Sequence, residues 1–421
     1  MTNLDLNHNR PTIMHIDLNS CFATIEQQAN PLLRGKPVVV AAYATPNGCV
    51  LSPSIEAKRR GIKVGMTVRD AHLLYPQVVV RTPDPPKYRD VHMKFKKIFM
   101  DYSPNVTPKS IDEAVIDFAN TPSLSKNLTD VAYEIKMRMR REIGEWITCS
   151  IGIATNRFLA KLGAGLHKPD GLDVITHENL VSVYKSIKLT DFCGISTHNE
   201  SRLNTYGVFT PLDFLKAPEE LLHRQVFQSI TGYYWYLRLR GWEIDAVDFE
   251  RKSYGQQYAL GKPTNDIREL SCLMMKLCEK MGRRLRRSGC AAQGIHVACV
   301  YKDYTHWHRG RKLDTPVFTT SDLYTKSLWV FNQQPEKKVV TKLAVSCFNL
   351  APSRSSQTTL FDIDPDKKRN LSDALDRIND KYGEFVITPA LMLGMDDLVL
   401  DRIAFGGVKE LDDLYAINPQ F

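Results

Sequence analysis

Three acidic residues give the first indication of chemistry in this sequence. Asp17 ends an apolar segment, and Asp112 and Glu113 are adjacent in a second one. Clustered carboxylates suit a hard cation such as Mg²⁺, which prefers oxygen ligands and keeps waters or substrate phosphates in its shell. Two such ions can hold the attacking and leaving oxygens of a phosphoryl transfer. Adjacent acids are common and usually face solvent, so a plain acidic surface remains the alternative.

Short strands and helices must position these acids. Residues 12–17 form a predicted buried strand followed by a helix that Ser20 could cap, which puts Asp17 at the C-terminal end of a strand. Folds of the α/β type place their chemistry at such ends. Neighbours on a strand point to opposite faces, so residues 112–113 can serve one site only from a turn or bulge, which we expect near Ser110.

The rest of the chain predicts strands and helices in mixed order, which indicates an α+β protein of several domains. The stretch from Leu189 to about Asp245 is predicted to be wholly helical, and residues 251–352 a small sheet with a long basic helix. The other predicted elements are strands at 37–42, 78–81 and 149–154, and helices at 55–60, 87–102, 128–143 and 267–288.

Length and composition limit the class of protein. The 421 residues leave room for two to four domains, and 43% hydrophobic residues exclude a largely disordered chain. No apolar run approaches the roughly 20 residues of a membrane span, and the start has no export signal. The nine cysteines contain no CxxC pair, which argues against a disulfide framework or thiolate zinc site. We therefore expect a soluble, unexported protein with reduced cysteines.

The positive charge is concentrated in one region. Residues 251–352 hold 18 Lys and Arg against 7 Asp and Glu, a surplus of +11, whereas the whole chain carries +9. Such a concentration is typical of a protein that binds the phosphate backbone of a nucleic acid. A solvated basic face is the alternative.

Five segments together resemble the Y-family DNA polymerases, the template-dependent enzymes of translesion synthesis. They occur in the family's order and spacing, and the nearest branch is bacterial DNA polymerase IV. Residues 47–58 are also similar to the catalytic subunit of polymerase V. The five segments are IDLNSCFATIE (16–26), NPLLRGKPVVV (30–40), IEAKRRGIKVGM (55–66), SIDEAVID (110–117) and IGIATNRFLAKLGAGLHKPDGL (151–172).

The resemblance implies a right-hand polymerase with palm, small fingers, helical thumb and α/β little finger. The implied boundaries are 1–24 and 85–180 for the palm, 25–84 for the fingers, 181–247 for the thumb with its helix-hairpin-helix, 248–352 for the little finger and 353–421 for a C-terminal tail.

The resemblance also assigns an active site. Asp17, Asp112 and Glu113 would hold two Mg²⁺, or Mn²⁺ in its place, with the backbone carbonyl of Leu18 completing one site. Phe22 matches the steric gate, whose ring would clash with a ribose 2′-hydroxyl; its alternative is a core aromatic. The other positions that would bind the deoxynucleoside triphosphate are Cys21, Ser52, Lys58 and Lys168.

Two positions depart from the family pattern, and a third bears on the range of lesions. Ile55 stands where a tyrosine is frequent and Lys58 where an arginine is frequent, and both changes remove hydrogen-bonding capacity. We therefore expect weaker nucleotide affinity or a greater dependence on Lys168. Leu51, in the region that covers the templating base, predicts a narrower tolerance for bulky lesions.

Two further regions are predicted to bind DNA. Residues 193–208 resemble a helix-hairpin-helix, whose backbone amides bind a DNA phosphate. Gly194 fits, but Ser196 replaces a glycine of the family pattern, so we expect a weaker contact, and a plain helix-helix connection is the alternative. In the little finger the candidates for backbone contact are Arg283, Arg284, Arg286, Arg287, Arg309 and Arg311.

The tail contains a candidate docking peptide. Residues 357–361, QTTLF, fit the peptide by which bacterial polymerases bind the sliding clamp, with Gln357, Leu360 and Phe361 as anchors. Residues 370–385 resemble the tail helix of some family members.

The predicted function is template-directed addition of deoxynucleotides to a primer 3′-hydroxyl, with low fidelity, bypass of damaged bases and no proofreading. We expect a monomeric, cytoplasmic, nucleoid-associated protein that binds primer-template DNA, deoxynucleoside triphosphates and the clamp, and no membrane. One alternative is a catalytically silent relative that acts as a clamp- and DNA-binding adaptor, which the substitution at Ile55 favours. A nucleotide cyclase with a similar palm is another, but it leaves the basic region and QTTLF unexplained.

Overall fold

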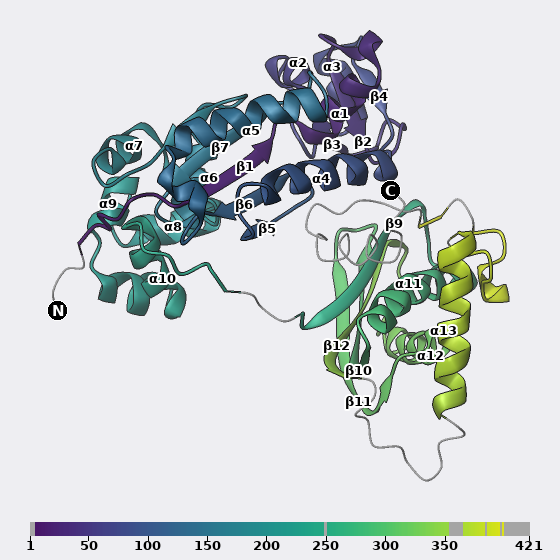
Figure 1. Cartoon of the computed structure of the whole chain (residues 1–421). Coiled ribbons are helices and arrows are strands. Elements are labelled where there is room, and N and C mark those ends of the chain that lie inside the picture. Colours follow the sequence, from purple (N-terminus) through teal and green to yellow (C-terminus); the bar gives the residue numbers. More distant parts are fainter. Residues whose placement is uncertain (1–4, 248–250, 353–364, 384, 396–397, 400–421) are drawn as a thin grey trace. The chain divides into compact units, whose positions relative to one another are not determined.

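The computed structural model describes residues 5–247, 251–352, 365–383, 385–395 and 398–399. The described residues divide into two compact units, 5–247 and those of 251–399, which are considered separately (Figure 1). Among the described residues, no helix combines the length and the apolarity that crossing a membrane requires.

A five-stranded sheet forms the centre of the first unit, with strand order β5-β6-β1-β7-β8. The central strand β1 pairs antiparallel with β6 and β7, and its register sets Asp17 opposite Glu113. The strands are β1 (Ile13–Leu18), β5 (Val106–Pro108), β6 (Glu113–Asp117), β7 (Cys149–Ala154) and β8 (Leu172–Val174). The acids predicted to meet are thus brought together by strand pairing between segments almost a hundred residues apart.

Side chains along β1 alternate between an apolar face of the sheet and a face that carries the candidate functional residues. Met14 and Ile16 pack in one core with helices α1 (Cys21–Ala29), α4 (Pro85–Met100) and α5 (Leu128–Glu142). His15 and Asp17 therefore lie on the opposite face, where α6 (Arg157–Leu166) packs. Figure 1 shows α4 and α5 running along the sheet.

Helix α6 lies unusually close to the sheet because β7 carries a glycine at the contact. A Cβ at Gly152 would lie 2.0 Å from the carbonyl oxygen of Ala160 and 2.3 Å from the backbone nitrogen of Ala164. Any other residue would push α6 outward. This close approach fixes the height of the α6 side chains above the acids of β1 and β6.

Ser20 does not cap α1 as expected. It precedes the helix, but its backbone is left-handed with φ 51°, and its side chain makes no capping hydrogen bond. Its backbone carbonyl instead accepts from the Thr24 amide at 3.0 Å. The turn into α1 is therefore set by the backbone.

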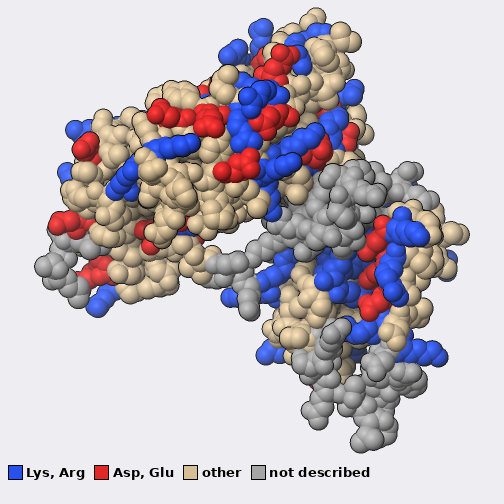
Figure 2. Space-filling view, in the orientation of Figure 1, with Lys and Arg blue, Asp and Glu red and all other residues tan. Residues whose placement is uncertain are grey.

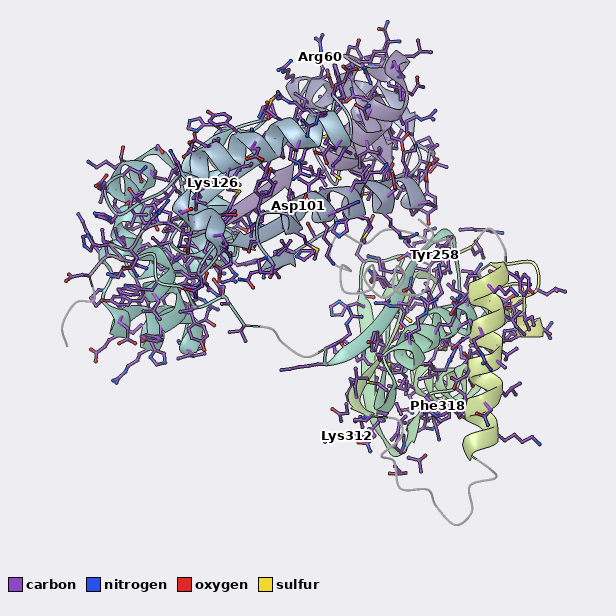
Figure 3. All side chains as sticks on the ribbon, in the orientation of Figure 1. Arg60, Asp101, Lys126, Tyr258, Lys312 and Phe318 are labelled. Carbon is purple, nitrogen blue, oxygen red and sulfur yellow. The ribbon has the colours of Figure 1, made fainter. Side chains whose placement is uncertain are left out.

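A small three-stranded sheet, with order β3-β2-β4, follows α1. Val39, Val50, Ala57 and Ile62 belong to its separate core, and Arg60 marks this part of the molecule in Figure 3. Its elements are η1 (Pro31–Leu33), β2 (Val38–Ala41), β3 (Val50–Pro53), α2 (Ile55–Arg59), α3 (Val68–Leu74) and β4 (Val79–Arg81). The helix predicted at 55–60 is present as α2, and the sequence analysis missed α3.

The helical stretch predicted from Leu189 to about Asp245 is confirmed as far as Leu239, whereas residues 242–247 form no helix and α7, which precedes the stretch, was not predicted. An aromatic cluster that includes Phe158 of α6, Phe192, Phe214 and Trp235 ties this part to the five-stranded sheet. The elements are α7 (Leu180–Ser186), η3 (Leu189–Asp191), α8 (Thr197–Thr205), α9 (Pro211–Lys216), the π-helical turn η4 (Leu221–Val226) and α10 (Ile230–Leu239). One 3₁₀ turn, η2 (Pro122–Ser125), precedes α5.

The second unit is a four-stranded antiparallel sheet with order β11-β10-β12-β9. Helices α11 and α12 pack on one face through a common core with Ile295, Val297, Leu343 and Val345. The elements are β9 (Ser253–Thr264), α11 (Ile267–Arg287), β10 (Cys290–Tyr301), β11 (His306–Val317), α12 (Thr320–Phe331) and β12 (Val340–Pro352). The long basic helix is confirmed; the sequence analysis missed α12.

The described part of the tail packs on this second unit, which differs from the expectation of a separate tail. Helix α13 (Pro365–Tyr382) and the turn η5 (Ala390–Met392) follow β12. The Nζ of Lys280 in α11 donates to the carbonyl of Val399 at 2.9 Å, and Met395 and Val399 join the core of the unit. Apolar and ionic contacts therefore make the described residues of 365–399 part of the same domain.

Candidate active site

Asp17, Asp112 and Glu113 converge at the end of β1. Asp17 and Glu113 are cross-strand partners on the α6 face. Asp112 ends the turn between β5 and β6, where its carbonyl accepts from the Leu18 amide at 2.9 Å and its Oδ1 accepts from the Ser110 hydroxyl at 2.6 Å. The predicted turn is confirmed, and it allows two consecutive acids to lie beside one strand end.

Two lysines of α6 and the loop after it neutralise this cluster. Lys168 Nζ lies 2.7 Å from Asp17 Oδ2, and Lys161 Nζ lies 2.6 Å from Glu113 Oε2. Lys168 was predicted, but Lys161 was not. Both lysines lie in the segment of family resemblance, residues 151–172, and this was the signal in the sequence that could have indicated Lys161.

The loop that carries Lys168 is held on several sides. The Asp170 amide donates to Asn19 Oδ1 at 2.8 Å, and the Asp170 carboxylate pairs with Lys136 at 2.8 Å. The Gly171 amide also donates to the Ser150 hydroxyl at 3.3 Å. The backbone at Lys168 is thus fixed while its side chain remains 42% exposed and able to turn.

Burial and mutual repulsion raise the proton affinity of two of the acids. Burial raises the pKa of Asp17 to about 6, against the Lys168 charge and with a further contribution from the other two acids. Burial also raises the pKa of Asp112. Burial acts in the same sense on Glu113, but Lys161 holds its pKa below the ordinary value. The site therefore holds more negative charge than two lysines neutralise, and its hard oxygen donors fit a divalent cation.

His15 is a member of this cluster that the sequence analysis missed. One ligand atom from each of His15, Asp17 and Glu113 lies within 4.8 Å of the others. His15 Nε2 is 3.6 Å from Glu113 Oε2 and makes no hydrogen bond. Burial lowers its pKa to about 4, so it is a neutral imidazole at pH 7. The signal was its position two residues before Asp17, on the same strand face.

Of the other predicted nucleotide-binding residues, Lys58 and Cys21 interact electrostatically with the acids, and Ser52 contacts the start of α1. Burial and the Lys168 charge lower the pKa of Lys58, while Asp17 and Asp112 act against them, which places Lys58 within electrostatic reach of the cluster. The acids Asp112 and Asp17, after burial, also raise the pKa of Cys21. Ser52 is buried and its hydroxyl lies 3.4 Å from the Ala23 amide.

Phe22 is a core residue in this structure. Its side chain is 1% exposed and stacks on Tyr88 with ring centroids 4.4 Å apart and planes inclined by 9°. Tyr88 in turn donates to the buried Glu26 at 2.9 Å. The core-aromatic alternative is therefore correct as a description of its packing, and the steric-gate role remains a prediction.

A basic pocket of about 600 Å³ opens beside the acids within the first unit. Its floor includes His15 and Val115 of the sheet, and Trp235 forms part of a wall. The cationic residues that line it are Lys109, Arg157, Lys161, Arg202 and Arg238. The predicted hairpin borders this pocket through Gly194, whose φ of 101° only glycine adopts easily, while Ser196 is the N-cap residue that precedes α8.

The arginines predicted to touch DNA along α11 are mostly engaged by the tail. Arg286, 7% exposed, pairs with both oxygens of Asp376 at 2.6 and 2.8 Å. Arg283 pairs with Asp380 at 2.5 Å, and Arg287 contacts the same carboxylate. Figure 2 shows acidic side chains beside basic ones along this part of the second unit. Arg283 and Arg286 are therefore poorly placed for a phosphate, which corrects the prediction.

Arg284 is also held within the unit. Its Nη1 donates to the carbonyl of Gly255 at 3.1 Å, and its guanidinium lies 5.7 Å from the Tyr254 ring centre. It thus bridges α11 and β9 and makes a structural contact.

The opposite face of the four-stranded sheet carries polar side chains that the sequence analysis missed. Strand alternation puts His296, His308, Lys312 and Lys342 on the face away from α11 and α12, with small Gly, Ala and Ser residues between them. The His296 and His308 rings approach to 3.3 Å between nitrogens. The exposed Lys312 is labelled in Figure 3. The alternation was visible in the sequence, but its direction depended on which face the helices cover.

Two predicted arginines belong to the edge strand β11. Arg309 and Arg311 lie opposite Val297 and Ile295, so their side chains start from the helix-covered face at the rim of the sheet. Arg309 is exposed and Arg311 half-buried. The predicted clamp peptide 357–361 lies outside the described residues.

Both units resemble parts of known proteins. The model of the impB/mucB/samB family matches residues 16–165, and the model of that family's C-terminal domain matches residues 251–360. DNA polymerase IV of Pelotomaculum thermopropionicum is 32% identical, covering 93% of this chain and 98% of its own. DNA polymerase IV 1 of Bacillus subtilis is 29% identical, covering 91% and 94%.

The fold has solved counterparts. A Y-family DNA polymerase chimera, Dbh-Dpo4(243-245)-Dbh, superposes with a TM-score of 0.71 at 23% identity, covering 80% of this chain and 98% of the chimera. The family models and the 32% identity to a DNA polymerase IV show the family, and the chimera shows that the chain has the fold of a Y-family DNA polymerase. The chain belongs to this family and is a DNA-directed DNA polymerase that resembles DNA polymerase IV.

Proposed function

We propose that this polymerase joins the primer 3′-hydroxyl to the α-phosphate of a deoxynucleoside triphosphate at Asp17, Asp112 and Glu113, with release of pyrophosphate. The observation that carries the proposal is the pairing of Asp17 and Glu113 across β1 and β6, each with a lysine beside it. Phosphoryl transfer needs positioning and charge stabilisation rather than covalent chemistry from the protein.

Family membership and fold imply a divalent cation, and the donor set of this site fits one. We infer that two Mg²⁺, or Mn²⁺, are held by the three carboxylates and the Leu18 carbonyl, where they would lower the charge on the reacting phosphate and the attacking oxygen. Lys168 and Lys58 would then bind the triphosphate, and Phe22 would exclude the ribose 2′-hydroxyl. Ile55 supplies no hydrogen bond, so this binding would depend on the two lysines.

The five-stranded sheet with α4, α5 and α6 fits a palm (1–24 and 85–180), and the three-stranded sheet fits the fingers (25–84). The helices of 181–247 fit a thumb and residues 248–352 a little finger. The fingers helices α2 and α3 have only five and seven residues. Such small fingers would leave the nascent base pair open, which supports low fidelity and bypass of damaged template bases. We propose that the protein lacks proofreading.

We propose two DNA-binding surfaces. The first is the basic pocket with the hairpin at Gly194, which would hold primer-strand phosphates. The second is the open face of the four-stranded sheet, where small residues allow close approach and Lys312 and Lys342 supply charge at the rim. Arg309 would extend this second surface along the edge. Docking on a sliding clamp through 357–361, a monomeric state and a cytoplasmic, nucleoid-associated location remain proposals from the sequence.

Primer extension with Mg²⁺ and single deoxynucleotides tests the proposal. Wild type should extend an undamaged primer-template distributively, and Asp112→Ala should abolish extension while DNA affinity stays within about twofold. Asp101→Ala is the matched control, because this exposed acid, labelled in Figure 3, follows the end of α4 and pairs with Arg138 rather than with a residue of the cluster. A well-folded wild type that binds DNA but never extends it would favour the adaptor.

A further inference from the structure

The pairing of Lys161 with Glu113 divides the cations of the basic pocket into two kinds. Arg157 pairs with Glu243 at 2.9 Å and Arg238 with Asp245 at 2.8 Å, and neither acid belongs to the carboxylate cluster. Lys161 also lines the pocket, but its partner Glu113 does belong to it. Lys161 therefore has a partner that a divalent cation would also bind.

The contact of Lys161 with Glu113 and the binding of a divalent cation to Glu113 exclude one another, because both partners are positively charged. Like charges a few ångströms apart repel strongly in a partly buried site, so an ammonium 2.6 Å from Glu113 competes with a divalent cation for that carboxylate. A lysine side chain is ordinarily charged at neutral pH, and the Glu113 carboxylate beside Lys161 favours the charged form. When metal occupies Glu113, this charged side chain must find another anion.

The pocket offers Lys161 a second position. The side chain is 37% exposed and has a flexible four-carbon stem, and α6 is fixed on the sheet at Gly152. The ammonium can turn from Glu113 into the pocket without movement of the backbone. An anion bound there, among Arg202 and the other lining cations, would meet an additional charge only after Lys161 had left Glu113.

We propose that Lys161 is a positioning residue with two alternative partners, Glu113 in the metal-free protein and a phosphodiester of the primer strand in the metal-loaded protein. Lys161 thereby couples metal binding to DNA binding: occupation of the carboxylates strengthens the contact with the primer. This inference rests on the proposed metal site and on the proposed DNA contact in the pocket.

The first test measures primer-template affinity by fluorescence anisotropy, with and without Ca²⁺ as a divalent probe and without nucleotide. Lys161→Met should weaken binding at least about fivefold with Ca²⁺, the low end of ordinary couplings, and less than about twofold without it. Arg202→Met, which removes a cation from the α8 wall of the same pocket, should weaken binding equally in both conditions. An equal loss for Lys161→Met in both conditions, or no loss in either, would overturn the proposal.

The second test measures Mn²⁺ binding without DNA by electron paramagnetic resonance. Lys161 competes with the cation for Glu113, so Lys161→Met should bind Mn²⁺ at least about fivefold more tightly than wild type, while Arg202→Met should stay within about twofold. Unchanged or weaker Mn²⁺ binding by Lys161→Met would overturn the proposal. Glu113→Gln distinguishes a failure of the proposed metal site from a failure of the proposed role of Lys161. If this variant binds Mn²⁺ as well as wild type, Glu113 is not a metal ligand, and the proposed role of Lys161 is wrong as well.

Discussion

The basic pocket beside the acids and the arginine-rich face of α11 both hold cationic side chains paired with acids, but these side chains differ in their exposure and in the kind of acid that pairs with them. In the pocket, Lys161 is partly exposed and its acid partner is a candidate metal ligand. On α11, Arg286 is buried and its partner Asp376 comes from the tail helix. A cation is available to a ligand only when its acid partner can be taken away. The charge surplus of residues 251–352 therefore overstates how much of that region can bind DNA.

The largest expected effect is on the rate of primer extension, when one acid is exchanged for its amide beside the basic pocket and another on the tail helix. Glu113→Gln should lower primer extension on the order of 10³-fold, because a lost metal ligand removes several kcal/mol of stabilisation from the transition state. Asp376→Asn should leave extension at saturating DNA within about twofold, because α13 lies in the other unit. Single-turnover extension rates compare the two, and a strong loss in Asp376→Asn would remove the distinction.

Asp376→Asn, which should hardly affect primer extension, should instead lower the stability of the second unit. Asp376→Asn removes the nearer of two acids beside the Arg286 guanidinium and leaves Glu279 at 4.0 Å, so the free energy of opening of α11 and α13 should fall by about 2–3 kcal/mol, less than for a fully buried pair. Hydrogen exchange of the α11 amides measures this. Asp373→Asn is the control, since it makes the same change at an exposed position of α13 and should cost no more than about 0.5 kcal/mol. Similar losses for both would mean that the buried pair contributes little.

The height of α6 above the sheet provides a geometric test of the pocket side. Gly152→Ala should push α6 and Lys161 away from β1 and lower extension by up to about 10²-fold, the cost of misplacing a site by about 1 Å. Gly165→Ala lies in the same helix, and its Cβ would meet nothing within 4 Å, so activity should be unchanged. Extension rates at saturating DNA distinguish the two, and equal activities would show that α6 need not lie so close.

The smallest expected effect separates the two faces of the second unit. Lys312→Met should weaken primer-template affinity about threefold and reduce the salt dependence by the slope of about one phosphate contact. Arg287→Met, at the end of α11, should change affinity less than about twofold, because Asp380 already holds this arginine. Anisotropy titrations at several salt concentrations would decide, and a larger loss for Arg287→Met would reverse the assignment of the DNA-binding face.

The sequence by itself determined the elements and the candidate acids. Apolar patterns predicted β1, β7, α5 and α11 within a few residues, because side-chain alternation and helical periodicity are local properties. The position of Asp17 at a strand end and the turn before Glu113 followed from the same patterns. The segments of family resemblance supplied Lys168, which lies beside Asp17.

Only the tertiary structure decided which charges meet. Lys161 reaches Glu113 because Gly152 lets α6 contact the sheet, and this packing joins three separate segments. His15 acquires its surroundings from strand pairing, and Arg286 finds its acid ninety residues away in the tail. Electrostatic pairing depends on distances in space and on burial, which local sequence does not fix. Sequence thus identified the charged residues of this polymerase, and packing determined which of them remain available to bind a ligand.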